Sequence, residues 1–424
     1  MSSPNVLRIR DFRKLWIGLG LSSLGDWLGL LALTAMANLF ADSYAGKNYA
    51  IATVLFLRVL PPLVVGPFAG YVADRLDRRT TLVVGDVIRG ALFVSIPFVG
   101  TLWWVFVVTV LVELVSVVWL PAKDASVPNL VAPDQLEQAN QVGLVTTYGS
   151  ALPAAALFAG LTFVDRVWPD VMGWLDRGAI DAALYLNGLS FLVSGAVIAT
   201  LHDLPRGPAS QHEAGVVSVI KEGWSYVART PVVRGLIIGI TGAFAAGGAV
   251  VGLARTLVAD LDGGDSGYGL LFGAVFAGLG LGMWKGPGLL EGRSRSQVFG
   301  IALTATGALL FPLALVPHLE VVTCVAVLVG FCAGTAWVTG NTLLGLEVPD
   351  DVRGRTFAFV GSMTKLALAA VLAVAPFVAG SLGSVDVGDT YHGAALTILL
   401  AAVLMTVVGV VSYRQMHRYV SEER

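Results

Sequence analysis

The stretch GPFAGYVADRLDRR, residues 66–79, joins two long apolar runs, 49–72 and 81–100. Its second half places two aspartates and three arginines within six positions: Asp74, Arg75, Asp77, Arg78 and Arg79. Because charged side chains are costly inside a bilayer, this cluster predicts a tight turn in water at a membrane surface. Basic residues are enriched in cytoplasmic loops, so the three arginines place the turn on the cytoplasmic side.

The composition of the whole chain agrees with a membrane location. Of its 424 residues, 56% are hydrophobic and 13% are charged, whereas soluble domains carry about 25% charged residues. We therefore expect a polytopic protein whose partner is the lipid bilayer. The basic residues are spread over many loops rather than gathered on one face, which predicts no nucleic-acid partner.

Twelve segments are apolar over the roughly 20 residues that a helix needs to cross the hydrocarbon core. The first is too long for a signal-peptide core and is interrupted by Asp26, so we interpret it as an uncleaved span. The sequence thus predicts an all-α membrane protein with twelve transmembrane helices in two six-helix bundles. The predicted spans lie near 15–40, 49–73, 81–100, 102–121, 143–164, 182–201, 233–258, 267–288, 297–316, 320–345, 357–381 and 391–412.

Charge asymmetry sets the predicted orientation. With the first residue inside, most lysines and arginines fall in inner segments, and the outer segments hold Lys47, Arg166, Arg177 and Arg255. This distribution predicts that both termini are cytoplasmic. We expect a multi-pass protein of a bacterial-type plasma (inner) membrane.

The longest inner link divides the spans six plus six. It predicts an N-terminal bundle at 1–201, a cytoplasmic linker at 202–232 and a C-terminal bundle at 233–424. Apolar residues recur at helical spacing in the linker, which predicts an amphipathic helix on the membrane surface; the alternative is an ordinary polar linker. The apolar positions are Val216, Val219, Ile220, Trp224 and Val227.

The pattern Gly70-x-x-x-Asp74-Arg75-x-x-Arg78-Arg79 resembles the signature of the major facilitator superfamily, in the loop between helices 2 and 3. The match departs at Asp77, where the family pattern usually has glycine. The resemblance implies the major facilitator fold, with this loop locking the two halves together on the cytoplasmic side. It also implies that the Asp74 carboxylate caps the N-terminus of span 11, which begins near Thr356 or Phe357 here.

Four further stretches are similar to the drug- and siderophore-exporting branch of the superfamily, which includes enterobactin-type and macrolide exporters. The resemblance implies that spans 1 and 4 line a central cavity. The chain departs from many proton-coupled members in lacking an arginine early in span 4. The stretches are Arg10-Asp11-Phe12-Arg13-x-Leu15-Trp16, Gly25-Asp26-Trp27, Arg58-x-Leu60-Pro61-Pro62 and Arg353-Gly354-Arg355.

Two carboxyls lie near the middle of their spans. Asp26 is about eleven residues into span 1, and Glu113 is about eleven residues into span 4, which brings both near the bilayer midplane at 1.5 Å per residue. A carboxyl at that depth faces a cavity or a partner. We predict that Asp26 and Glu113 take up and release the protons that drive export.

Static ion pairing is the alternative for both carboxyls. Arg58 in span 2 or Arg89 in span 3 is a candidate partner for Asp26, while Asp86 and Arg89 have the spacing of a structural i,i+3 pair. We treat Arg58, Arg89 and Lys365 as charge partners lining the cavity. Lys365 has its own alternative, which is to extend its ammonium group to the inner surface.

Several motifs are absent from the sequence. It has no G-x-x-x-x-G-K-[ST], no H-E-x-x-H and no G-x-S-x-G, so we expect neither an ATPase motor nor an enzyme, and no metal or cofactor. The sequence predicts a monomeric proton-coupled antiporter for multidrug efflux, which exports small amphipathic molecules by alternating access. The alternatives are a lipid or lysophospholipid flippase on the same fold and a non-transporting membrane anchor or sensor.

Overall fold

The computed structural model of the protein describes residues 6–132, 135–201, 230–286, 288, 292–348, 350–383 and 393–422. Within these ranges, side chains are described except at 66–75, 125, 137, 140–141, 144, 350–359, 361–362, 365 and 417–422. The described chain is helical and contains no strand. The predicted amphipathic helix in the linker lies outside the described residues.

The chain forms two compact units. The first comprises residues 1–40 and 57–211, and the second comprises 41–56 and 212–424. Helix α2 therefore contributes its first part to the second unit and the rest to the first.

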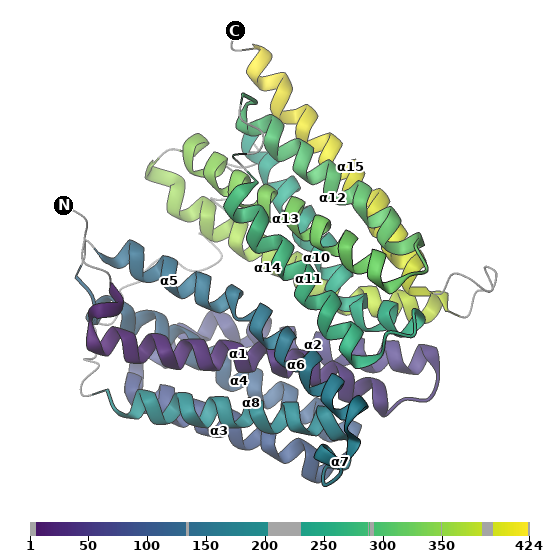
Figure 1. Ribbon diagram of the computed structural model, residues 1–424. Coiled ribbons are helices and arrows are strands. Elements are labelled where there is room, and N and C mark those ends of the chain that lie inside the picture. Colours follow the sequence, from purple (N-terminus) through teal and green to yellow (C-terminus); the bar gives the residue numbers. More distant parts are fainter. Residues whose placement is uncertain are drawn as a thin grey trace. The chain divides into compact units, whose positions relative to one another are not determined.

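The helices of the first unit are joined by short connections (Figure 1). Helices α1 and α3 both pack along α8, and α3 also packs on α4. The bounds are η1 Val6–Arg8, α1 Arg10–Leu39, α2 Tyr44–Arg75, α3 Arg78–Val99, α4 Leu102–Ser126, η2 Val127–Asn129, α5 Leu136–Gly149, α6 Ala151–Val167, α7 Pro169–Met172 and α8 Gly178–Ala199.

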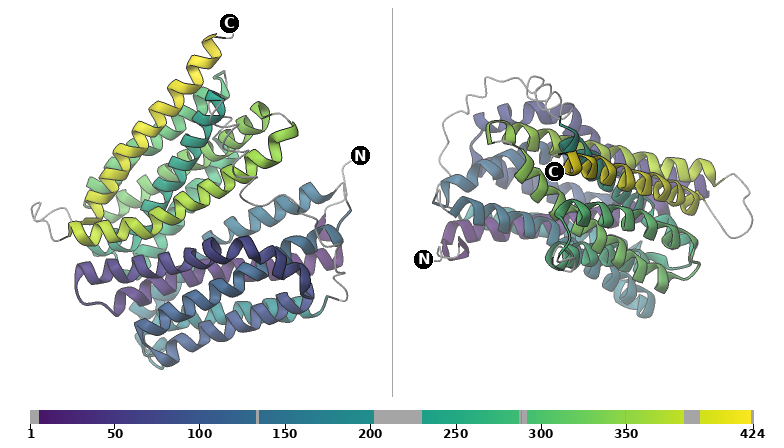
Figure 2. Two further views of the ribbon diagram at one scale, coloured as in Figure 1. Left: turned by 180° about the vertical axis from the view of Figure 1, so that it is seen from behind. Right: turned by 90° about the horizontal axis from the view of Figure 1, so that it is seen from above.

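The second unit contains six more helices. Helix α11 packs on α13, α10 packs on α14, and α12 lies beside α15 (Figure 2). Their bounds are α10 Pro231–Asp260, α11 Gly264–Lys285, α12 Arg295–Leu315, α13 Leu319–Glu347, α14 Asp350–Leu382 and α15 Gly393–Glu422.

The twelve predicted spans all fall on helices, which confirms the all-α membrane fold. The fifth span is divided between α5 and α6, next to Ser150. In the described part of the chain, eleven helices are long and apolar enough to cross a membrane, and the apolar part of α14, Leu366–Leu382, is shorter.

The turn between α2 and α3 shows why aspartate is accepted at position 77. Asp77 has an extended backbone, with φ −68° and ψ 119°, and is the N-cap of α3. Its Oδ1 accepts a hydrogen bond from the Thr80 amide at 2.8 Å. This turn needs no left-handed residue, so the glycine of the family pattern is replaced by a capping side chain.

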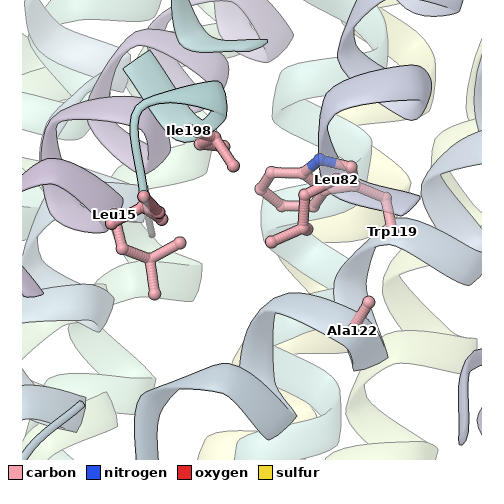
Figure 3. Packing of buried hydrophobic residues seen from close by; sticks show 6 residues of the cluster. Leu15, Leu82, Trp119, Ala122 and Ile198 are labelled. Atoms are coloured by element: carbon pink, nitrogen blue, oxygen red, sulfur yellow. The ribbon is translucent and has the colours of Figure 1, made fainter. Parts of the chain in front are cut away.

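A buried apolar cluster holds one end of the first unit together. Side chains from α1, α3, α4 and α8 meet around the Trp119 ring (Figure 3). Each helix buries an apolar stripe in this cluster. This packing fixes the rotation of each helix, and so the direction of the polar side chains one to three turns away. The cluster consists of Leu15, Leu82, Trp119, Ala122, Ile198 and Leu201.

Candidate functional site

Asp26 lies in the interior of α1, one residue after Gly25. A Cβ at Gly25 would collide with Asn187 and Ser190 of α8, so the glycine allows α1 and α8 to approach closely. The Asp26 side chain is half-buried. Among the described residues, its carboxylate makes no hydrogen bond and no ion pair.

Arg58 connects three helices of the first unit. Its Nε lies 3.1 Å from Glu113 Oε1 on α4. Its Nη2 donates to the backbone carbonyl of Asp26 on α1 at 3.2 Å. The side chains of Arg58 and Glu113 are 25% and 15% exposed, so the pair is largely withdrawn from solvent.

Arg89 and Asp86 form a second, more deeply buried pair on α3, at i,i+3 spacing. The side chains of both residues are almost fully buried, at 1% and 0% exposure. Ser194 of α8 donates to Asp86 Oδ2 at 2.7 Å, and Arg89 Nη2 donates to Ser22 of α1 at 3.3 Å. The structural i,i+3 pair expected from the sequence is confirmed.

Aromatic rings complete the enclosure of Arg89. Its Cζ lies 4.5 Å from the centre of the Trp119 ring and 4.4 Å from that of Phe191. Its Nη1 donates to Ser116 Oγ of α4 at 3.4 Å. The guanidinium is therefore held by a carboxylate, hydroxyls and two π faces, a set of contacts suited to a fixed structural charge.

The two ion pairs show which carboxyl each arginine contacts. The sequence leaves open a static pair between Asp26 and either Arg58 or Arg89. In this structure Arg58 pairs with Glu113, and Arg89 pairs with Asp86. The Asp26 carboxyl nevertheless lies within Coulombic range of both guanidiniums.

The five ionisable groups act on one another through their charges. The charge of Glu113 interacts with the charges of Arg58, Asp26 and Arg89. The charge of Asp86 interacts with those of Arg89 and Asp26. Three carboxyls thus share two guanidiniums, which leaves one negative charge uncompensated when all five are ionised. In a site of low dielectric constant an uncompensated charge is expensive, and a proton on one carboxyl removes it.

Two basic side chains, Arg79 of the signature region and Lys14 of α1, contact the carbonyl end of α8. Arg79 Nη2 donates to the carbonyl of Ala199, and Lys14 Nζ donates to the carbonyl of Thr200 at 2.8 Å. Positive charges stabilise the carbonyl end of a helix. Arg78 is buried. The side chains of Gly70, Asp74, Arg75 and Lys365 lie outside the described part, so their predicted roles stay predictions.

Sequence reasoning did not identify the residues that hold the arginines in place. Ser22 and Ser194 are ordinary small residues in apolar helices, and nothing in the local sequence relates them to α3. Trp119 lies in the second half of α4, where it is 4% exposed and packs against Arg89.

A comparison with protein families matches the sequence to a known family. The family model described as "Transmembrane secretion effector", of the major facilitator superfamily, matches residues 1–423. The chain belongs to this family. The superfamily predicted from the signature loop is therefore confirmed.

Individual members of the superfamily are similar over different lengths of the chain. An uncharacterised MFS-type transporter of Mycobacterium tuberculosis is 31% identical over 84% of this chain and 81% of its own length. The MFS-type transporter YfiS of Bacillus subtilis is 27% identical over 50% of this chain, and the match spans 48% of YfiS. A putative bacilysin exporter, BacE of Bacillus subtilis, is 29% identical over 45% of this chain and 44% of its own length.

Solved structures of low identity share the fold. A bacterial homologue of the human lysosomal transporter Spinster, in an inward-facing and unoccupied conformation, has a TM-score of 0.75 at 12% identity, over 97% of this chain and 98% of its own. The nucleoside transporter NupG has a TM-score of 0.67 at 15% identity, over 95% of this chain and 98% of its own. The family member described here therefore has the major facilitator fold.

Proposed function

We propose that the protein is a proton-coupled antiporter that exports small amphipathic molecules across a bacterial plasma membrane by alternating access. One observation carries this proposal. Arg58 holds the Glu113 carboxylate while it also holds the backbone of Asp26, whose own carboxyl has no partner among the described residues. Asp26 can bind a proton, and Glu113 competes with it for the same guanidinium. This arrangement suits the coupling of proton transfer to a movement of the helices.

The proposed cycle follows from the charge balance of the cluster. With one proton on Asp26, the remaining two carboxylates and two guanidiniums neutralise each other. When that proton leaves, the Asp26 carboxylate competes with Glu113 for Arg58, which lies on α2. A shift of Arg58 would move α2 relative to α1 and α4, since all three helices meet at this one side chain. Arg89 keeps its own pair with Asp86 and serves as the fixed positive charge.

Outward transport is supported by the relatives. The family is described as a secretion effector, and one relative carries the name of a putative exporter. The proposed machinery also includes the signature loop of Gly70, Asp74, Arg75, Arg78 and Arg79, which would lock the cytoplasmic side between bundles at 1–201 and 233–424. We further propose cytoplasmic termini and a monomer as the working unit.

The test uses the full-length protein in proteoliposomes with an imposed pH gradient. A growth-inhibition screen of expressing cells first selects a transported compound. We expect gradient-driven movement of that compound, accompanied by opposite proton movement reported by an internal pH dye, and loss of both with an uncoupler. Asp26→Asn should abolish the proton signal. The control is Asp170→Asn, which changes an exposed carboxyl on α7.

Two results would refute the proposal. One is transport of the selected compound at the same rate with and without the gradient. The other is a normal proton signal from the Asp26→Asn protein at normal expression.

A second candidate is a lipid or lysophospholipid flippase. A groove of about 560 Å³ lies between α3 and α4, and its walls are mostly apolar side chains such as Val84, Ile88 and Leu114. Such a groove suits an acyl chain better than a polar substrate. Movement of a fluorescent lysophospholipid between leaflets, without any effect of the pH gradient, would favour this candidate over the exporter.

A further inference from the structure

A second cavity lies at the end of the first unit where α1 begins. It has a volume of about 320 Å³, is open on one side and is lined by residues of α1, α4, η2 and α5. Its lining combines the aromatic residues Phe12 and Trp16 with Lys123 and Asp124. Small-molecule sites are typically concave, mostly apolar and furnished with a few polar groups, with volumes from about 300 Å³ upward.

The aromatic walls of this cavity are fixed by contacts outside it. Trp16 Nε1 donates to Thr146 Oγ1 of α5 at 2.6 Å. Phe12 is 3% exposed and packs in a cluster with Val6, Val131 and Ala139. Because these side chains are held before any ligand arrives, little ordering cost would accompany binding.

Gly143 of α5 lines the cavity and has no side chain to fill it. Among the described side chains, a Cβ at this position would meet Leu19 Cδ2 at 3.8 Å, which is ordinary van der Waals contact. A larger side chain placed there would therefore fill space that a ligand needs, without a clash against the described backbone.

The charged side of the cavity can accept a new partner. Lys123 Nζ lies 2.6 Å from Asp124 Oδ1, but the Asp124 side chain is 63% exposed whereas that of Lys123 is 14% exposed. An ion pair with one solvent-exposed member contributes little to stability. Among the described residues, no other ion pair of Lys123 is seen. A carboxylate entering the cavity can replace Asp124 at Lys123 at small cost.

We propose that this cavity is a substrate-entry subsite that selects small amphipathic carboxylates. The apolar body of the ligand packs on Trp16 and Leu19, and its carboxylate binds Lys123 Nζ in the half-enclosed site, where a charge-assisted hydrogen bond is strong. This inference rests on the proposed export function and narrows its substrate class.

The test is equilibrium binding to the full-length protein in detergent micelles, by isothermal titration calorimetry. The probes are 4-phenylbutanoate and its neutral amide, 4-phenylbutanamide, each also titrated into protein-free micelles. We expect the acid to bind about tenfold more tightly than the amide, the preference that one charge-assisted contact supplies. Lys123→Gln should remove this preference, Lys123→Arg should retain it, and Gly143→Leu should abolish binding of both probes.

The matched control is Lys285→Gln. It removes a lysine at the end of α11, in the second unit, where Lys285 lies over the Trp284 ring. Equal affinity of the wild type for acid and amide would overturn the proposal, as would a preference that survives Lys123→Gln or binding that survives Gly143→Leu. Because this assay contains no proton gradient, its failure is distinguishable from a failure of proton coupling in proteoliposomes.

Discussion

Arg58 of α2 and Glu113 of α4 form an ion pair 3.1 Å long in the interior of the first unit, and the same arginine donates to the Asp26 carbonyl of α1. One guanidinium therefore links three helices, and it does so beside a carboxyl that has no partner of its own among the described residues. This relationship separates two kinds of acid in the cluster. Glu113 is held by a charge, whereas the Asp26 carboxyl makes no ion pair or hydrogen bond among the described residues.

Removing one member of the Arg58–Glu113 pair should destabilise the protein. Glu113→Gln leaves the guanidinium without its counter-charge in a largely buried site, and we expect a loss of about 1–3 kcal/mol, below the 3–5 kcal/mol of fully buried pairs. Arg58→Gln should cost a similar amount. The double variant should cost less than the sum, measured as unfolding in mixed micelles. Additive losses would show that the pair contributes no coupling energy.

Asp26→Asn should behave in the opposite way. The amide keeps the shape of the carboxyl, and the substitution breaks no hydrogen bond or ion pair of the described structure. The free energy of unfolding should therefore change by no more than about 1 kcal/mol, the centre of the range for point substitutions. Proton-coupled transport should fall at least about a hundredfold, since an amide cannot carry a proton. The measurement is gradient-driven transport together with thermal unfolding of the same preparation. A variant that transports normally, or that unfolds far more easily than the wild type, would contradict this assignment.

The sequence predicted the fold well because the length of an apolar span is a local property. Counting residues from the ends of their spans placed Asp26 and Glu113 at similar levels, and in the structure Arg58 contacts both residues. The Asp86–Arg89 pair could be found because both residues lie on one helix. In each case the information lies within a single segment.

The pairing of Arg58 could not be found in this way. Depth along a span does not fix rotation about the helix axis, so Arg58 could face Asp26 or Glu113 equally well from the sequence. The choice depends on how α1, α2 and α4 pack, which follows from contacts such as the close approach at Gly25. For the same reason, Ser22 and Ser194 gave no sign of their contacts with Arg89 and Asp86.

Asp86→Asn should cost more stability than any change at Asp26. It leaves the Arg89 guanidinium buried at 1% exposure without a compensating charge, and breaking a buried pair costs about 3–5 kcal/mol. We expect reduced yield of folded protein and a lower unfolding temperature. A combined Asp86→Leu and Arg89→Leu variant should recover much of this loss, because no buried charge is left. Failure of the double variant to recover would indicate that Arg89 is held mainly by its aromatic and serine contacts.

The cap of α3 offers a prediction that separates the two possible residues at position 77. Asp77→Ala removes the hydrogen bond to the Thr80 amide and should cost about 1 kcal/mol, whereas Asp77→Gly should cost only a few tenths. The reason is that glycine is itself a tolerated N-cap and leaves the amide open to water. Thermal unfolding of both variants provides the measurement, with Asp77→Asn as the control that keeps a side-chain acceptor. If alanine and glycine were equally harmful, or if Asp77→Asn were as harmful as alanine, the aspartate would be needed for its charge beside Arg78 and Arg79 rather than as a cap.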